Sequence, residues 1–210
     1  MVIDLTLPLE DDMPLFPGLP TFDSEANVSE ETGALTHRLH MSSHQGTHVD
    51  APRHYDEDGK TLDEVGLETL RGEATIVDLR EHRGDPISAE VLETADADVS
   101  AGDFLVLITG DVDERFYDED FFTEASALTA DAAEWLVDKE VSVVANDFLS
   151  EGIHDPERPV HNTVLGAGIP FVEYIANTDA IADRDTVDIV CAPLHLKGFE
   201  AAPARVFVSE

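Results

Sequence analysis

The chain alternates short apolar segments with amphipathic ones, and this alternation limits the folds that it can adopt. Runs rich in Val, Ile, Leu and Phe predict strands at 2–9, 34–42, 73–79, 103–110, 141–147, 170–175, 186–193 and 204–210. Helical spacing predicts helices at 64–70, 88–95, 129–140 and 162–167. Because several successive strands have no helix between them, the pattern favours an α/β fold with a mixed sheet. No linker interrupts it, so we expect a single domain over residues 1–210.

The clearest helix is expected at 129–140. Thr129 stands where an N-cap is expected, and Ala133, Leu136 and Val137 recur on one face. Ser88 has the same role ahead of the predicted helix at 88–95.

The charge balance restricts the partners of this chain. It carries 46 Asp and Glu against 12 Lys and Arg, a formal net charge of −34. Nucleic acids and anionic membrane surfaces are therefore disfavoured partners, because both are polyanionic. The acids are scattered along the whole chain, which indicates adaptation of the surface to its solvent and not a separate acidic arm.

The sequence offers no sign of export or of a membrane span. A basic segment followed by an apolar one does not open the chain, and no apolar run approaches the roughly 18 residues that a spanning helix needs. The lone cysteine, Cys191, lies in an apolar run and is expected to be a small buried hydrophobe. We expect a cytoplasmic protein.

Residues 44–54, HQGTHVDAPRH, concentrate metal-ligand chemistry. His44, His48, Asp50 and His54 all have even numbers, so in an extended chain their side chains share one face. A fully extended run of this length spans roughly 33 Å, too far for all four to reach one ion. The glycine and the Ala-Pro pair permit the bending that would bring them together.

Imidazole nitrogens and a carboxylate are ligands for Zn, Mn or Fe. The absence of thiolates from the motif argues against a closed structural zinc site, and three protein ligands leave coordination positions open. The alternative is a polar surface loop without a metal.

This motif resembles the signature H-x-G-T-H-x-D-x-P-x-H of the metal-dependent cyclase/formamidase family, which includes bacterial kynurenine formamidases and isatin hydrolases. Further segments resemble the family in the same order, namely residues 3–22, 143–152, 160–181 and 192–206. The family's usual Trp-Pro-Gly-Asp is replaced by Phe-Pro-Gly-Leu at 16–19.

The resemblance implies a swivelling β/β/α fold and a homodimer or homotetramer. It implies one divalent ion, Zn or Mn, held by His44, His48 and Asp50. It also implies that Asp50 bridges to a second ion held by the set His54, His161 and Glu173. In single-metal members of the family the residue matching His54 is catalytic instead, so both arrangements stay open.

The implied reaction is hydrolysis of a small amide, as in the arylformamidases. His54 or Glu173 would accept and return the proton. Hydrolysis of a lactam such as isatin, or reaction of another small carbonyl substrate, is the alternative, and a metal-binding protein without catalysis is a further one. Phe16, Tyr55 and Phe148 are candidate walls for an aromatic substrate, although ordinary core packing is the favoured role for each of them.

Several polar residues are given no place among the ligands. Asp147 is expected to cap a turn or support the site, and Arg205 is a possible ion-pair partner that would leave Glu173 without a metal. The remaining histidines are expected to lie outside the ligand set; they are His37, His40, His82, His154 and His195. Of these, His154 and His195 could border the site. Motifs for a serine nucleophile or a phosphate-binding loop are absent from the sequence.

The unbalanced charge generates a prediction about salt. We hypothesise that the source organism keeps a salt-rich cytoplasm. At molar salt the Debye length falls to about 3 Å, so the repulsion between surface carboxylates is screened. We expect a higher melting temperature in multimolar KCl than in dilute buffer, measured by calorimetry. An equal or higher melting temperature in dilute buffer would show the hypothesis to be wrong.

Overall fold

The computed structural model describes residues 1–209 apart from 12, 96 and 154. The strands are β1 Val2–Asp4, β2 Asp23–Val28, β3 Leu35–His40, β4 His48–Asp50, β5 Arg71–Asp78, β6 Pro86–Ile87, β7 Phe104–Ile108, β8 Ala127–Leu128, β9 Val143–Asn146, β10 Phe171–Glu173, β11 Thr186–Pro193 and β12 Ala201–Ser209. The helices are α1 Ala89–Thr94, α2 Asp111–Arg115, α3 Phe121–Glu124, α4 Ala130–Asp138 and α5 Pro159–Gly166, with 3-10 turns η1 Pro52–His54, η2 Arg80–His82 and η3 Thr178–Ala180.

The main sheet closes into a barrel. Its strand order is β1-β12-β11-β5-β7-β9-β10-β4, and β4 also pairs with β12, so only β1 stands outside the ring. Strands β5, β7, β9 and β10 run parallel to one another, because helices lie in the connections between them. The remaining pairs of the ring are antiparallel. The expected mixed α/β sheet is confirmed.

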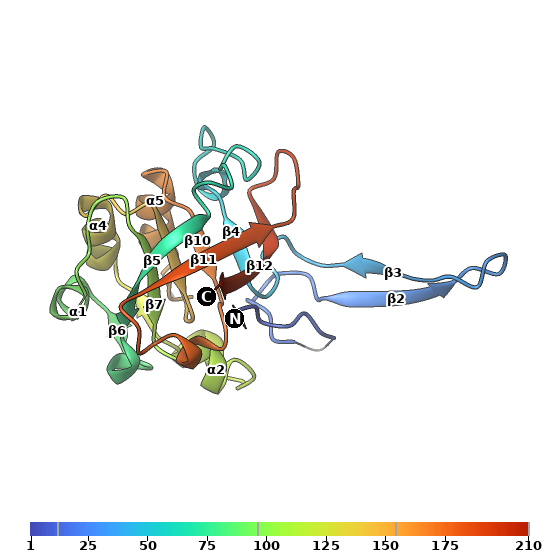
Figure 1. The fold of residues 1–210 in the computed structure, drawn as a ribbon, viewed down its shortest axis with the longest axis horizontal. Helices are drawn as coiled ribbons and strands as arrows, with labels where there is room; N and C mark the ends of the chain where they lie inside the picture. The colour runs from blue at the N-terminus through green and yellow to red at the C-terminus, as the bar shows by residue number, and fades with distance from the viewer. Residues whose placement is uncertain (12, 96, 154, 210) are drawn as a thin grey trace.

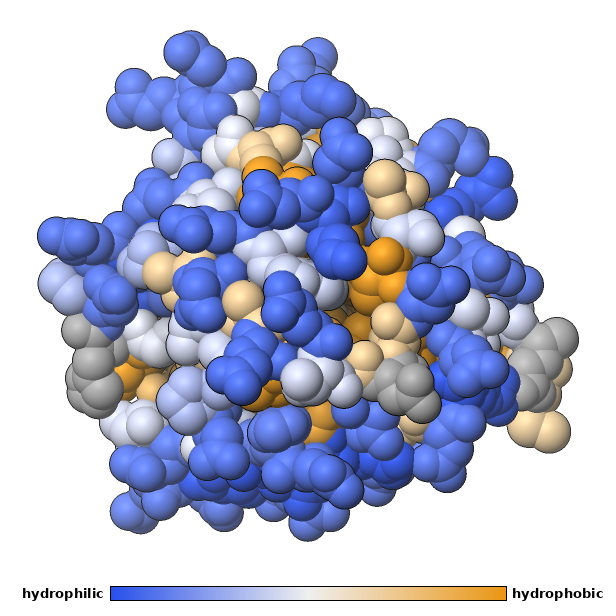
Figure 2. Space-filling view, turned by 90° about the vertical axis from the view of Figure 1, so that its left-hand side faces the viewer, coloured by the Kyte–Doolittle hydropathy of each residue, from blue (hydrophilic) through white to orange (hydrophobic). Residues whose placement is uncertain are grey.

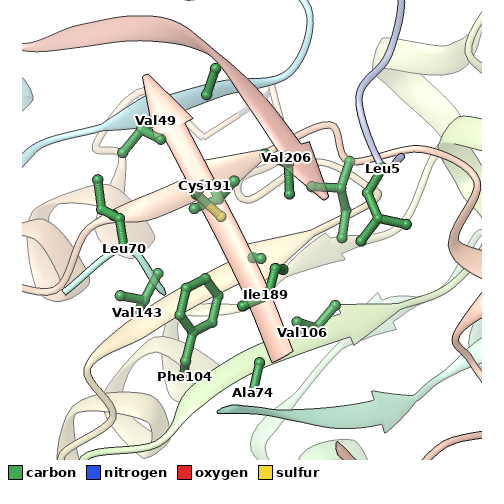
Figure 3. Close-up of a cluster of buried hydrophobic side chains, with 14 of the residues drawn as sticks. Leu5, Val49, Leu70, Ala74, Phe104, Val106, Val143, Ile189, Cys191 and Val206 are labelled. Carbon is green, nitrogen blue, oxygen red and sulfur yellow. The ribbon is translucent and has the colours of Figure 1, made fainter. Parts of the chain in front are cut away.

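Alternate residues of the barrel strands fill two cores. On β7, Phe104 and Val106 belong to the core inside the barrel, and Leu105 and Leu107 to the core outside it. Figure 3 shows part of the inner core, with Cys191 among its aliphatic neighbours. Cys191 is buried, as expected, and burial raises the pKa of its thiol well above the ordinary value.

The outer core lies between the barrel and its helices. Helix α4 buries Ala132, Ala133 and Leu136 there, while Val137 is half-buried against the same cluster. Burying one such leucine contributes roughly 1.5–3 kcal/mol. On the helix-bearing side the surface is mainly hydrophilic, and apolar residues show mostly in hollows (Figure 2).

The two expected helix caps behave differently. Ser88 Oγ accepts a hydrogen bond from the Val91 amide at 3.4 Å, which confirms the cap of α1. Thr129 occupies the N-cap position of α4, but its hydroxyl is hydrogen-bonded to the Ile87 carbonyl at 3.1 Å and to the Asp131 carboxylate. The side-chain cap expected of Thr129 is therefore wrong.

Two segments differ from the expected secondary structure. The helix expected at 64–70 is wrong: this stretch forms consecutive turns, with Thr69 N donating to Gly66 O and Leu70 N to Leu67 O. Gly66 within it disfavours a helix, and the turns deliver Leu70 to the inner core. The strand expected at 2–9 ends at Asp4. Helix α5 begins three residues before the expected range, because a proline at 159 suits the first turn of a helix.

Strands β2 and β3 form a hairpin that extends away from the barrel (Figure 1). Almost all of its residues are exposed, including Val28, Leu35 and Leu39. His37 and His40 lie on this arm, so their expected place outside the ligand set agrees with the fold. No helix in the described part of the chain is long and apolar enough to cross a membrane.

Candidate metal centre

Strand β4 carries the centre of the motif. Val49 points into the inner core, so period-two alternation directs His48 and Asp50 to the other side. Strand β10 pairs with β4 and places Glu173 directly opposite His48 and Phe171 opposite Asp50. Three candidate ligands thus share one side of two neighbouring strands.

The backbone bends on both sides of β4. Gly46 has φ +58°, which glycine adopts without strain, and a Cβ there would lie 2.6 Å from Leu9 Cδ2, so a larger residue would be strained and would displace the Leu9 side chain. After Asp50, Pro52 begins the 3-10 turn η1, which ends on His54. The bends bring the ring centres of His44 and His54 to 4.2 Å. The expected gathering of the motif is confirmed.

The first group of candidate ligands is His44, His48 and Asp50, whose ligand atoms all lie within 4.8 Å of one another. Asp50 Oδ1 is 2.8 Å from His44 Nδ1 and 3.3 Å from His48 Nε2. His48 Nδ1 donates to the Gly46 carbonyl at 2.8 Å, since a carbonyl can only accept. The lone pair of His48 Nε2 is therefore directed toward the site.

Two buried atoms in this group are unsatisfied. His48 Nε2 and Asp50 Oδ1 make no hydrogen bond of good geometry among the described residues, although Asp50 Oδ1 has ion-pair contacts with His44 and His48. Such atoms are costly to bury, and a carboxylate oxygen facing an imidazole lone pair is more costly still. A divalent cation between them would satisfy both, so the residues present fit a metal ion.

The second group is Asp50, His54 and His161, again with ligand atoms within 4.8 Å of one another. Asp50 Oδ2 lies 4.0 Å from His54 Nε2, so the two oxygens of this carboxylate face different groups. Glu173 lies between the groups too, with Oε2 3.4 Å from His48 Nε2 and Oε1 3.5 Å from His161 Nε2. Ser150 donates a hydrogen bond to Glu173 Oε1.

Glu151 is a site residue that the sequence analysis missed. Its Oε2 lies 2.5 Å from His161 Nδ1, and its Oε1 accepts a hydrogen bond from the Val160 amide. This contact puts the proton of His161 on Nδ1 and leaves Nε2 facing Glu173, an arrangement typical of metal-binding histidines. Glu200 was also missed; its Oε1 lies 3.5 Å from His44 Nε2. Neither glutamate has a local spacing that would have revealed it.

Carboxylates control the protonation of two histidines. Burial by itself lowers the pKa of His44, but the neighbouring Asp50 outweighs burial and raises this pKa to about 9. For His161 the hydrogen bond to Glu151 likewise outweighs burial and raises the pKa to about 10. Burial favours the neutral form of Asp50, yet His44 and His48 hold its pKa well below the ordinary value. The site therefore attracts cations strongly.

The pKa of His54 shifts in the opposite direction. Burial lowers its pKa, and the Asp50 carboxylate only partly offsets this. Its imidazole is therefore neutral at pH 7 and free to act as a metal ligand or as a base.

A cavity of about 170 Å³ opens onto these groups. Besides the candidate ligands it is lined by aromatic and aliphatic side chains, namely Phe16, Leu19, Tyr55 and Tyr174. Tyr55 stacks on the His161 ring with a centroid distance of 4.9 Å. Phe148 is fully buried in the outer core and does not line the cavity, so core packing, the favoured role, is confirmed for it.

The other candidates lie apart from the cavity. Asp147 is fully buried and accepts hydrogen bonds from the amides of Thr109 and Gly110, as expected of a supporting residue. Arg205 pairs with Asp4 at the surface, so the alternative ion pair with Glu173 is wrong.

His82 is half-buried on η2, and His195 is exposed; neither lines the cavity. The prediction for His154 lies outside the described residues.

Known proteins resemble the chain over nearly its whole length. The Cyclase family model matches residues 3–151. The kynurenine formamidase of Bacillus cereus is 30% identical over 209 residues, covering 98% of this chain and 96% of that protein.

Solved structures also resemble this chain over nearly its whole length. One described as a potential metal-dependent hydrolase with cyclase activity is 30% identical and superposes with a TM-score of 0.83, covering 99% of this chain and 96% of the other. An isatin hydrolase bound to the product analogue thioisatinate shares the fold, with a TM-score of 0.86 at 20% identity over 99% and 91% of the two chains. The chain therefore belongs to the cyclase family that the signature at residues 44–54 indicated.

Proposed function

We propose that this chain is a metal-dependent amide hydrolase of the arylformamidase kind. The observation that carries the proposal is the meeting of two groups of candidate ligands on the two oxygens of Asp50, beneath a cavity with aromatic walls. The kynurenine formamidases among the relatives support a formamide as the substrate class.

The residues present would hold one or two divalent ions, which we propose to be Zn or Mn because the donors are nitrogen and oxygen. His44, His48 and Asp50 would hold the first ion, and Asp50, His54, His161 and Glu173 the second. When bound, such an ion lowers the pKa of water and polarises the substrate carbonyl.

His54 would act first as the general base and then as the general acid of the reaction. Its neutral imidazole can accept a proton from the attacking water as the water oxygen bonds to the formyl carbon. The same proton then passes to the leaving nitrogen as the carbon–nitrogen bond breaks, which yields formate and an aryl amine. If His54 is a ligand of a second ion, Glu173 would take this part, with Ser150 holding its other oxygen.

The cavity suits an aromatic leaving group. Its volume of about 170 Å³ is close to the roughly 150 Å³ of a cavity that admits benzene. Phe16 and Tyr55 line the cavity, and their contact with such a group would exclude water from the reacting carbonyl.

The function is tested by hydrolysis in high salt with Zn or Mn. We expect the metal-loaded protein to hydrolyse N-formylkynurenine or a simple aryl formamide. We expect His48→Ala to lower kcat/KM about a thousandfold or more, because metal catalysis supplies several kcal/mol of transition-state stabilisation. His37→Ala on the exposed arm is the matched control and should leave kcat/KM unchanged.

Hydrolysis of isatin alone would favour the lactam alternative. No hydrolysis of any of these substrates would favour another carbonyl substrate or a metal-binding role. Formamide hydrolysis that survives in His48→Ala would contradict the proposed centre.

Metal content tests the assignment of ligands. We expect His48→Ala and Asp50→Ala to lose bound metal, because each removes a donor at the core of the cluster. His161→Ala and Glu173→Gln should lower the content from about two ions per chain toward one. The content is measured by elemental analysis of chains loaded in high salt, with His37→Ala as the control.

Full metal content in both His48→Ala and Asp50→Ala would contradict the first ion site. One ion per chain in the unmodified protein, unchanged in His161→Ala and Glu173→Gln, would contradict the second. His54 would then stand as a catalytic histidine beside a single metal.

We also propose that the protein is a cytoplasmic homodimer or homotetramer. An isolated two-stranded hairpin is marginally stable in water, and the arm formed by β2 and β3 exposes Val28, Leu35 and Leu39. A second copy covering the arm would bury these side chains.

Light scattering in high salt should give a mass of two or four chains. The double variant Leu35→Glu with Leu39→Glu should shift this mass toward that of one chain. A monomeric mass for the unmodified protein would contradict this.

A further inference from the structure

Arg158 is the one lysine or arginine among the described residues that line the cavity. The other ionisable side chains there are the candidate ligands, the phenols and Glu151. Arg158 is half-buried, and its guanidinium carbon lies 5.2 Å from the centre of the Phe16 ring. Its cation–π contact with Phe16 holds the head group over an apolar wall.

The guanidinium of Arg158 has no carboxylate partner. Across the described chain, no Asp or Glu oxygen lies within 4.0 Å of it, although the protein carries 46 acids. Other arginines, such as Arg71 and Arg205, pair with Glu68 and Asp4. An arginine kept apart from acids on such a chain, and facing a cavity, is available to an anion that enters the cavity.

The backbone fixes Arg158 in this position. Its φ of 49° and ψ of 52° are left-handed, which is uncommon for a residue other than glycine. Its carbonyl accepts hydrogen bonds from both nitrogens of Asn162, and Pro159 begins α5 directly after it. Arginine caps a helix poorly, and the left-handed conformation costs about 1–3 kcal/mol. Helix formation therefore does not explain an arginine here.

The acids that line the cavity together with Arg158 are already engaged. Glu151 accepts hydrogen bonds from His161 and from the Val160 amide. Asp50 and Glu173 face the candidate metal ligands. None of these carboxylates needs Arg158, so its positive charge is left for a ligand.

We propose that Arg158 binds a carboxylate on the substrate, so that the preferred substrates are anionic aryl formamides. This rests on the proposed function and narrows it from aryl formamides in general to those that carry a carboxylate. The planar guanidinium can donate two parallel hydrogen bonds to a carboxylate. The aromatic ring would lie against Phe16 and Tyr55, with the formyl group toward the metal ligands. The carboxylates of Asp50, Glu151 and Glu173 line the same cavity and repel an anion at close range, so a local cation is needed to hold one.

The test compares 2-formamidobenzoate with its methyl ester, which differ in the carboxylate charge. Both are measured at one high KCl concentration with metal-loaded protein. Arg158→Gln should raise KM for the carboxylate about tenfold to a hundredfold, with kcat nearly unchanged, because a charge-assisted pair of hydrogen bonds is lost. The ester should be unaffected, and Arg158→Lys should fall between. Arg71→Gln, which removes the same charge at an exposed ion pair, is the matched control.

A parallel decline for acid and ester in Arg158→Gln would overturn the proposal, because it would show a structural role only. Unchanged kinetics on the carboxylate would overturn it as well. Binding of 2-aminobenzoate, measured by calorimetry, separates this proposal from the proposed function. If neither substrate is hydrolysed, the proposed function is wrong. Weaker binding of 2-aminobenzoate by Arg158→Gln, and not by Arg71→Gln, would still support the anion site. Equal binding in both variants overturns it.

Discussion

The short strand β4 makes hydrogen bonds to a neighbour on each side, and both the fold and the site depend on them. Through β10 and β12 it closes the ring of strands. The same pairing sets His48 opposite Glu173 and turns Val49 into the inner core. A shift of one residue in the β4 register would turn His48 and Asp50 into the inner core and Val49 toward the site. The apolar core therefore enforces the position of the candidate ligands.

The buried site concentrates carboxylate charge that the fold balances only through histidines. Asp50 is 1% exposed and Glu173 is 6% exposed, and the cationic side chains within reach are histidines. Protons on His44 and His161 can balance these carboxylates, as their raised pKa values show. A metal ion would replace those protons, so metal affinity rises with pH as the histidines release them. Cation binding thus offsets the free-energy cost of burying these carboxylates.

Local patterns in the sequence predicted part of this arrangement. The period-two spacing placed His48 and Asp50 correctly, and the strand positions of β5, β7, β9, β11 and β12 followed from runs of apolar residues. The signature at 44–54, through the family it resembles, brought in His161 and Glu173. The turns at 64–70 were missed because tertiary contacts, such as Cys191 N to Leu70 O, overrode a weak helical pattern.

Residues that act through long-range contacts carry no such pattern. Glu151 reaches His161 from ten positions away, and Glu200 approaches His44 only because β12 lies beside β4. Arg158 stands in a polar stretch of sequence, and only its left-handed backbone and the nearness of Phe16 distinguish it. Sequence spacing describes neighbours on one strand or helix, whereas these three residues meet the site from two loops, one between β9 and α5 and the other between β11 and β12.

The acidic surface and the cavity place different demands on electrostatics. In concentrated salt the field of the surface carboxylates extends only about 3 Å, so it neither guides nor repels a substrate over distance. Contacts inside a half-buried cavity are screened much less, because few mobile ions enter it. Recognition of an anion under these conditions must rely on direct hydrogen bonds at contact distance. Arg158, held against Phe16 and free of acidic partners among the described residues, has the geometry for such a contact.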